Sequence, residues 1–515
     1  MKRVSNYHSH VSLCGHATGN VEDYIKEAIK QKYEEVGISD HAPIPEYFVG
    51  KDQHENLWLS QMMTRDTFEN DYLKQLDYCI NKYQNEIKIY KGLETEYIPS
   101  KDYYYQYLLS KVDYLNLGVH YFFKNGKIVE TYAFLTEEDL EGYTQTIEEA
   151  LKTNYFSCLV HPDIFLYRID KFTPFHEQIS RRIIKACIEN DVYLEVNCNG
   201  KNRYPREEFW KIVKEYKEAK IIINSDAHKV SDFHGENVQR TIQFCENLNL
   251  NILEKMELKE NKGLKTFFVG HRGSSLGPVV NNTLSGFKLG IERKYYALEC
   301  DVRVTTDGVY YIHHDPTITL YNNNFVEEEI LAKGMNPDDD IQKFSWDEIK
   351  DLNLYYTFEE KKYYDKLILF EDYIKLCKDN NIKCVIELKY TNGINSNDTS
   401  KIDGLVDIIK KHEMMDYVFI LTSMKNCLLY IKEHYPLMNL VLLTGEKTTN
   451  MENVQWCIEH KMSLDGYYPL MTQEIIDTLR NNELSSNAWT VNKQEASDKL
   501  KEMNVDFITT DVITK

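Results

Sequence analysis

The sequence predicts an α/β protein built from two barrel domains, a distorted (β/α)₇ barrel followed by a (β/α)₈ barrel. Short apolar runs alternate with amphipathic stretches of helical length along the whole chain, which is the pattern of βα units. The second half holds eight such runs, the number of strands in a (β/α)₈ barrel, and the first half is a shorter series of the same kind. Charged and imidazole side chains directly follow many runs, as expected at the face where barrel enzymes place their active sites.

The expected strands can be read in order along the chain. In the first half they lie at 34–41, 86–94, 114–120, 157–163, 192–199 and 220–228. In the second half they lie at 267–273, 296–302, 384–389, 417–423, 440–445, 464–469, 486–491 and 506–511. Between the two series, residues 246–265 begin as a helix and end in Lys, Glu, Asn and Gly, which is typical of a linker. We therefore predict one domain at 1–258 and a second at 259–515.

Composition excludes several classes of function. Lys and Arg number 61 against 81 Asp and Glu, so the 515 residues carry a net charge of −20, which argues against a nucleic-acid footprint and a polybasic membrane anchor. No apolar run approaches a membrane span, and the polar, histidine-rich start lacks the apolar stretch of a signal peptide. Eleven cysteines without C-x-x-C pairs fit a reducing compartment. We expect a cytoplasmic protein without stable membrane insertion. The sequence does not determine its oligomeric state.

Nine potential metal ligands lie at the ends of the expected strands in the first half. On an extended segment His8 and His10 point to the same face, so the two imidazoles can hold one cation. The full set is His8, His10, His16, His41, Glu94, His120, His161, Asp226 and His228. Imidazoles beside carboxylates suit Zn, Mn or Fe, and nine ligands exceed the need of one ion. The sequence thus predicts a polynuclear cluster.

These residues lie in ordered motifs, YHSHVSLCGH, GISDHAP, GLETEYIP, GVHYF, VHPD, LEVNCNG and NSDAH, which cover nearly all of 1–255. The motifs resemble those of the PHP (polymerase and histidinol phosphatase) family, in its histidinol-phosphatase branch. The resemblance implies a phosphatase with three divalent metals. One ion would be held by His8, His10, Glu94 and Asp226, a second by Glu94, His120 and His161, and the third by His16, His41 and His228. Gly118 departs from the serine that the branch often has.

Two arginines in the first half are candidate phosphate contacts, Arg168 and Arg203, since a guanidinium fork matches phosphate oxygens. For each of them a plain surface arginine is an equally good interpretation.

A second constellation follows the strands of the other half. Glu299, Asp301 and Glu387 make a three-carboxylate oxygen site, which prefers Mg or Ca to Zn. Histidines near such a site can share general acid and base work. Arg272 and Lys389 add positive charge for a phosphate.

The motifs GHRGSS, NNTLSGF, ECDVRVTTDG, IHHDPT, IELK, NAWTVN and DFITTD span nearly all of 267–513. They resemble the glycerophosphodiester phosphodiesterase family of TIM barrels. The resemblance implies that His271 and His314 are the acid/base pair and His313 a bystander. It implies one metal on Glu299, Asp301 and Glu387, phosphate contacts from Arg272 and Lys389, and a pocket lined by Trp489. Asn281 stands where the family has Glu, which leaves the metal ligands intact but puts the exact substrate in doubt.

The leading interpretation is a bifunctional hydrolase of small-molecule phosphoesters. The second domain would cleave a glycerophosphodiester to an alcohol and a glycerol phosphate, and the first would hydrolyse a phosphomonoester, with that product as one candidate. The alternative is a histidinol-phosphate phosphatase fused to a phosphodiesterase of unrelated substrate. Two other classes, an enzyme that trims DNA ends and a protein that binds phosphorylated ligands without turnover, fit less well. The negative charge opposes the first, and complete ligand sets in both domains oppose the second.

Overall fold

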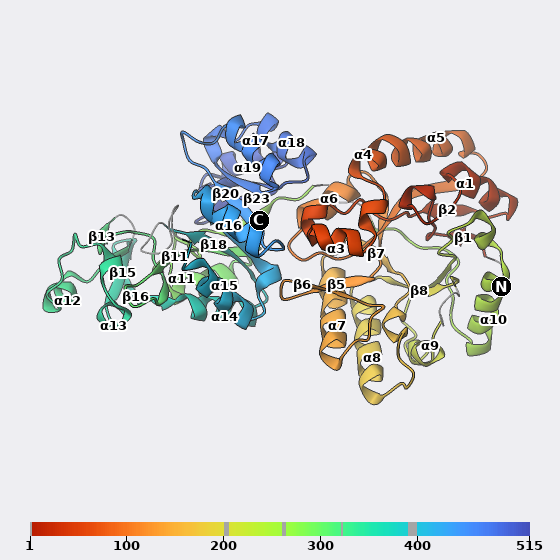
Figure 1. Ribbon diagram of the computed structural model, residues 1–515, viewed down its shortest axis with the longest axis horizontal. Helices are drawn as coiled ribbons and strands as arrows, with labels where there is room; N and C mark the ends of the chain where they lie inside the picture. Colours follow the sequence, from red (N-terminus) through yellow and green to blue (C-terminus); the bar gives the residue numbers. More distant parts are fainter. Residues whose placement is uncertain (1–2, 200–204, 260–263, 321–322, 390–398, 515) are drawn as a thin grey trace. The chain divides into compact units, whose positions relative to one another are not determined.

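The structure is a computed structural model that describes residues 3–199, 205–259, 264–320, 323–389 and 399–514 (Figure 1). The chain forms two compact units, Met1–Gly263 and Leu264–Lys515. The domain boundary between 258 and 259 stays a prediction. No helix in the described parts of the chain is long and apolar enough to cross a membrane.

The first unit is a nearly closed barrel of seven parallel strands, which confirms the predicted fold class. In sheet order the strands are β1 (Ser5–Asn6), β2 (Glu35–Ile38), β3 (Lys88–Thr95), β4 (Tyr114–Leu117), β7 (Phe156–Leu159), β8 (Tyr193–Asn197) and β9 (Ile221–Asn224). Its principal helices are α1 (Val21–Lys30), α5 (Leu73–Tyr83), α6 (Asp102–Leu109), α7 (Glu137–Lys152), α8 (Pro174–Glu189), α9 (Glu207–Val213) and α10 (Glu236–Leu248). Figure 1 shows α7 and α8 alongside each other.

Local sequence explains where these helices begin. At α7 the side chains of Thr136 and Asp139 each accept a hydrogen bond from the backbone N–H of the other residue, and α8 starts with the same reciprocal arrangement between Thr173 and His176. Such side chains satisfy N–H groups that have no partner inside the helix, and Pro174 at the first turn loses no hydrogen bond there.

Tyr114 fixes the packing of the first strands. Its hydroxyl donates to the Tyr7 carbonyl at 2.8 Å, and its side chain lies against Gly37 of β2 and Gly92 of β3. A Cβ atom at Gly37 would stand 2.1 Å from the Tyr114 hydroxyl oxygen, so no larger residue fits there without movement. The two glycines therefore let a buried tyrosine tie β1 to β4.

Shorter elements complete the first unit. Between β2 and β3 run α2 (Glu46–Val49), α3 (Lys51–Asn56), η2 (Leu59–Gln61), α4 (Arg65–Thr67) and η3 (Phe68–Tyr72). After β4 comes an antiparallel hairpin, β5 (Tyr121–Lys124) and β6 (Lys127–Glu130). Short helical turns lie at η1 (Ser12–Cys14), η4 (Ile164–Leu166) and η6 (Val230–Phe233).

The second unit is a closed barrel of eight parallel strands, and each expected strand of this half is one of them. They are β10 (Phe267–Gly270), β11 (Ala297–Val304), β18 (Lys383–Leu388), β19 (Val418–Thr422), β20 (Asn439–Leu443), β21 (Ser463–Tyr467), β22 (Ser486–Trp489) and β23 (Phe507–Thr510). β10 pairs with both β11 and β23, which closes the barrel. The helices are α11 (Leu284–Glu292), α14 (Phe370–Asp379), α15 (Ile402–Lys411), α16 (Lys425–His434), α17 (Met451–His460), α18 (Gln473–Asn481) and α19 (Gln494–Glu502).

An insertion between β11 and α14 was not expected from the sequence. Two of its strands, β12 (Tyr310–Ile312) and β17 (Ile368–Leu369), extend the barrel sheet in antiparallel fashion. A separate antiparallel sheet holds β13 (Thr319–Leu320), β14 (Asn323–Phe325), β15 (Asn353–Phe358) and β16 (Lys361–Lys366). With α12 (Glu327–Ala332), α13 (Trp346–Ile349) and η7 (Ile341–Lys343) this sheet encloses a small core that includes Phe325, Ile330, Ile341, Ile349 and Leu354.

Candidate active sites

The predicted ligands of the first unit converge at the carboxyl ends of its strands. Eight of the nine line one cavity of about 490 Å³, and the ninth, His8, is fully buried beside His10. Parallel strands end at the same edge of the barrel, so residues far apart in sequence meet there.

Glu94, at the end of β3, is the centre of this cluster. Its Oε2 lies 3.3 Å from Nε2 of both His8 and His10, whereas its Oε1 lies 2.9 Å from His161 Nε2 and 3.7 Å from His120 Nε2. Burial raises the pKa of this carboxyl, but the nearby imidazoles, His8 and then His120, outweigh burial and hold the pKa well below its usual range. One carboxylate with an oxygen toward each of two imidazole groups is the geometry of a bridging ligand.

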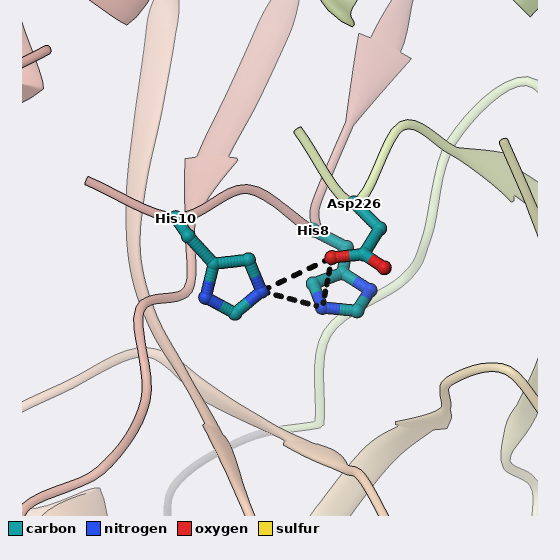
Figure 2. Close-up of side chains that lie close together, drawn as sticks. All are labelled: His8, His10 and Asp226. Atoms are coloured by element: carbon teal, nitrogen blue, oxygen red, sulfur yellow. Dashed lines mark hydrogen bonds and ion pairs between the residues drawn. The ribbon is translucent and has the colours of Figure 1, made fainter. Parts of the chain in front are cut away.

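His8, His10 and Asp226 form one compact group (Figure 2). The two Nε2 atoms lie 3.1 Å apart, and Asp226 Oδ1 lies 3.5 Å from His8 Nε2 and 3.2 Å from His10 Nε2. Each Nδ1 faces another carboxylate, Glu195 at 2.8 Å for His8 and Asp40 at 3.3 Å for His10. With the hydrogen on Nδ1, both Nε2 lone pairs point toward a carboxylate oxygen. That donor set fits a divalent cation.

The structure groups the remaining ligands partly as predicted. Glu94, His120 and His161 come together, with their ligand atoms all within 4.8 Å of one another. His41 lies in such a group with His10 and Glu94.

The trio predicted for the third ion is looser. The ring centroid of His16 lies 5.3 Å from that of His41 and 4.8 Å from that of His228. Among the described residues, these three histidines do not form a group whose ligand atoms all lie within 4.8 Å of one another. Each of His16 and His228 directs Nδ1 at a backbone carbonyl, so Nε2 remains for a ligand bond. The number of ions and the third set of ligands stay predictions.

Sequence reasoning missed the acidic residues behind the imidazoles. Glu195 accepts hydrogen bonds from the His161 backbone and from Asn197 and Asn224, in addition to its contact with His8. Glu96 holds His120 Nδ1 at 2.7 Å. Carboxylates in this position fix the orientation of a metal-binding imidazole. Both residues lie inside the motifs LEVNCNG and GLETEYIP, which is the only signal that the sequence offered.

The two arginines predicted at the phosphate have different outcomes. Arg168 does not line the cavity; its Nε donates to the Tyr132 carbonyl at 3.0 Å and its guanidinium lies over the Phe134 ring. Arg203 lies outside the described residues. No Lys or Arg occurs among the described residues that line the cavity. The phosphate roles of Arg168 and Arg203 stay predictions.

One side of the cavity is apolar. The segment between β2 and β3 contributes Ile44, Leu57, Trp58, Leu59 and Met62 to the lining. The Trp58 side chain is 66% exposed although it borders the cavity. A large exposed aromatic at a cavity mouth is available to contact a ligand.

In the second unit the three predicted metal ligands come together. Glu299 and Asp301 lie on β11, and Glu387 lies opposite Asp301 on the paired strand β18. Burial first, and then the Asp301 charge, raises the pKa of Glu299 well above its usual value, although Arg272 donates its backbone N–H to Glu299 Oε2 at 2.8 Å. The other oxygen of Glu299 is buried without a hydrogen-bond partner. A hard divalent cation fits this all-oxygen set.

The residues predicted to contact phosphate surround those carboxylates. Lys389 Nζ lies 2.6 Å from Glu387 Oε1 and 3.0 Å from Asp301 Oδ1, and Arg272 Nε lies 3.4 Å from Asp301 Oδ2. Asn282 donates to Asp301 Oδ2 at 2.7 Å. Asn281 directly precedes Asn282 in the sequence and is also buried. It is the residue that stands in place of the family's Glu.

The two histidines predicted as acid and base differ clearly from His313. His271 follows β10 and His314 follows β12, and each has Nδ1 2.7 Å from an aspartate. His313 is buried, and burial followed by the Arg303 charge lowers its pKa to about 3. Trp489 ends β22, where its Nε1 donates to the Thr444 carbonyl at 2.9 Å.

Comparison with known proteins gives both halves a family. Residues 6–199 match the PHP domain, and residues 271–515 match the glycerophosphoryl diester phosphodiesterase family. A glycerophosphodiester phosphodiesterase of Caldanaerobacter subterraneus is 25% identical over 248 residues, which cover 48% of this chain and 95% of that protein. A protein of Deinococcus radiodurans named "Probable histidinol-phosphatase" is 25% identical over 174 residues, 32% of this chain and 62% of that protein.

Among solved structures, the glycerophosphodiester phosphodiesterase of Parabacteroides distasonis is 24% identical, with a TM-score of 0.38, over 48% of this chain and 93% of its own. Each family match falls on the barrel that carries the corresponding ligand groups. The chain therefore contains an N-terminal PHP domain and a C-terminal domain that belongs to the glycerophosphoryl diester phosphodiesterase family.

Proposed function

We propose that the chain is a bifunctional metal-dependent phosphoester hydrolase whose C-terminal domain cleaves glycerophosphodiesters to an alcohol and a glycerol phosphate. The observation that carries this proposal is the carboxylate trio of Glu299, Asp301 and Glu387, the first two of them buried, beside two cationic residues. A Mg or Ca ion on that trio would neutralise charge on the phosphoryl oxygens. Arg272 and Lys389 would then turn from the carboxylates to the phosphate.

In this reaction the two histidines move protons. One imidazole takes the proton of a glycerol hydroxyl as that oxygen attacks phosphorus, and the other gives a proton to the alcohol oxygen as its bond to phosphorus breaks. The product is a cyclic phosphate. Water then opens the ring: the histidine that lost its proton accepts one from the water, and the other returns a proton to the glycerol oxygen. His271 and His314 end the cycle in their starting states.

For the N-terminal domain we propose hydrolysis of a phosphomonoester. Divalent transition metals such as Zn, Mn or Fe, held by the nine-residue set around Glu94, would supply an activated water at neutral pH. The leading substrate is the glycerol phosphate released by the other domain, since that product belongs to the class of ester the first domain would use. We also propose a cytoplasmic location, because eleven cysteines without C-x-x-C pairs fit a reducing compartment.

The two activities can be separated in the full-length chain. Glu387→Ala removes a ligand of the second domain only, so diester cleavage should fall by at least about 10²-fold, because the ion supplies several kcal/mol of charge stabilisation. Hydrolysis of phosphomonoesters by the same variant should remain at the wild-type rate. A variant that keeps full diesterase activity would contradict the assigned metal site.

The apolar side of the cavity favours a second candidate for the N-terminal domain. The glycerol group of glycerol phosphate carries an oxygen on every carbon and would leave Leu57, Trp58 and Met62 without apolar partners. A phosphomonoester with an apolar or ring-bearing alcohol would cover them, and histidinol phosphate is the first to try.

This second candidate can be tested by comparing kcat/KM for two phosphomonoesters. One is a 2-arylethyl phosphate and the other is glycerol phosphate. Trp58→Ala should lower kcat/KM for the aryl ester by about tenfold. Loss of an apolar contact in a binding pocket costs about 1–3 kcal/mol of binding free energy. Tyr78→Ala is the matched control, because Tyr78 is also an exposed aromatic, at 54%, but does not line the cavity. A wild-type preference for glycerol phosphate would exclude this candidate.

A further inference from the structure

Each of the two histidines in the second unit has an aspartate of its own. His271 Nδ1 lies 2.7 Å from Asp511 Oδ1, and His314 Nδ1 lies 2.7 Å from Asp315 Oδ1. We infer that Asp511 and Asp315 are positioning residues that keep the hydrogen of each imidazole on Nδ1 and so reserve Nε2 for proton exchange with the substrate. The inference rests on the proposed diesterase function.

The Asp511 contact depends on closure of the barrel. His271 follows β10 and Asp511 follows β23, and these two strands pair with Gly270 opposite Thr510. The His271 backbone N–H donates to the Thr510 carbonyl at 2.9 Å, which extends the pairing to the histidine itself. The first and last strands of the barrel therefore bring together two residues that are 240 positions apart.

Asn492 holds the Asp511 carboxylate in place. Its Nδ2 donates to Asp511 Oδ2, while its Oδ1 accepts the Asp511 backbone N–H at 2.9 Å. One carboxylate oxygen thus faces Asn492 and the other faces His271. Burial raises the pKa of Asp511, but the hydrogen bond and charge of His271, together with the hydrogen bond from Asn492, outweigh burial and lower the pKa, so this carboxylate is ionised at neutral pH.

The second contact is local in sequence and is fixed differently. Asp315 directly follows His314, and its side chain is only 3% exposed. Arg303 donates from Nε to the His313 carbonyl at 3.0 Å and from Nη2 to the His314 carbonyl, which ties the loop after β12 to strand β11. Burial raises the pKa of Asp315, but the hydrogen bond with His314 and the nearby imidazole and guanidinium groups, His313 first, together outweigh burial and lower the pKa.

An ionised carboxylate at Nδ1 has two effects on an imidazole. It accepts the Nδ1 hydrogen, so that the neutral ring presents a lone pair at Nε2. It also stabilises the imidazolium formed when Nε2 takes a proton, in the way that a buried aspartate supports the histidine of a Ser-His-Asp triad. An asparagine in its place can donate its amide hydrogen to Nδ1 and favour the wrong tautomer.

The test uses Asp511→Asn and Asp315→Asn in the full-length chain. Each variant should lose about 10²–10⁴-fold in turnover of a glycerophosphodiester, the range for a general acid or base and for loss of its aspartate. Removing the negative charge lowers the pKa of the His271 imidazole, so the limb of the pH–rate profile that His271 sets should move to lower pH in Asp511→Asn. ¹⁵N NMR of the histidine rings should show Nδ1–H at His271 and His314 in the wild type and a shift toward Nε2–H in the variants.

Controls separate positioning from a structural role. Asp403→Asn changes an aspartate that binds only the hydroxyls of Tyr430 and Tyr435 among its described side-chain partners, and it should leave rate, pH profile and tautomers unchanged. Asp511→Glu should restore part of the activity because it restores the carboxylate. Wild-type rings with the hydrogen on Nε2, or variants with an unchanged pH profile, would overturn the inference. A wild-type chain that cleaves no glycerophosphodiester would contradict the diesterase proposal instead. The NMR measurement would then still show whether each imidazole carries its hydrogen on Nδ1, as the positioning role requires, or on Nε2.

Discussion

Glu94 is the residue on which the predicted metal cluster of the first unit should depend most. Its two oxygens face separate imidazole groups, so a change at this position acts on both. We predict that Glu94→Gln loses two ions, because an amide oxygen is a weaker ligand than a carboxylate, whereas His16→Ala loses one. Elemental analysis of the carefully purified full-length variants measures this, against about three ions in the wild type. A wild-type chain with one ion or none would refute the three-metal cluster.

At the residue scale, the sequence predicted side chains that follow strands and could not predict their partners across strands. His8 and His10 are visible as a spaced pair, and Glu299 and Asp301 likewise. The Glu195 contact with His8 and the Asp511 contact with His271 join residues 187 and 240 positions apart. No local pattern encodes such a contact, because it exists only after the barrel has closed.

At the scale of elements, regular βα units were predictable and irregular ones were not. The barrel strands of the second unit each show an apolar run, since both of their faces are buried. β1 has only two residues, Ser5 and Asn6, so its run is too short to recognise. The insertion after β11 consists of short antiparallel strands whose pairing depends on neighbours in space, and propensity alone does not identify such strands.

The core of that insertion supports the loop that carries His314, and its stability can be measured. Phe325 is buried, 1% exposed, and its ring centroid lies 5.4 Å from that of His313. Phe325→Ala should destabilise the second unit by about 3–5 kcal/mol, the usual cost of removing a buried phenyl ring. Urea unfolding of the full-length chain gives the change in free energy.

The matched control lies in the same insertion. Leu331 is 58% exposed, so Leu331→Ala should change the free energy of unfolding by no more than about 0.5 kcal/mol. Equal effects of the two substitutions would mean that the insertion does not fold around the Phe325 cluster.

At the scale of the whole molecule, two barrels that each carry a candidate metal site share one chain. Each barrel brings together compact groups of His, Asp or Glu side chains that suit metal binding. If the C-terminal domain releases a phosphomonoester and the N-terminal domain hydrolyses one, as we propose, the product class of one domain is the substrate class of the other. This match in chemistry predicts that the diester is cleaved first and that the resulting monoester is hydrolysed afterwards.

Supplied with a glycerophosphodiester, the full-length chain should release the alcohol first and inorganic phosphate afterwards. Asp226→Ala removes a ligand next to His8 and His10 and should stop the reaction at glycerol phosphate. His271→Ala should leave the diester intact, yet still release phosphate from added glycerol phosphate. ³¹P NMR follows diester, monoester and phosphate in one sample. A wild-type chain that accumulates glycerol phosphate without consuming it would contradict the sequence of reactions, and the apolar cavity side near Trp58 would then point to a different monoester.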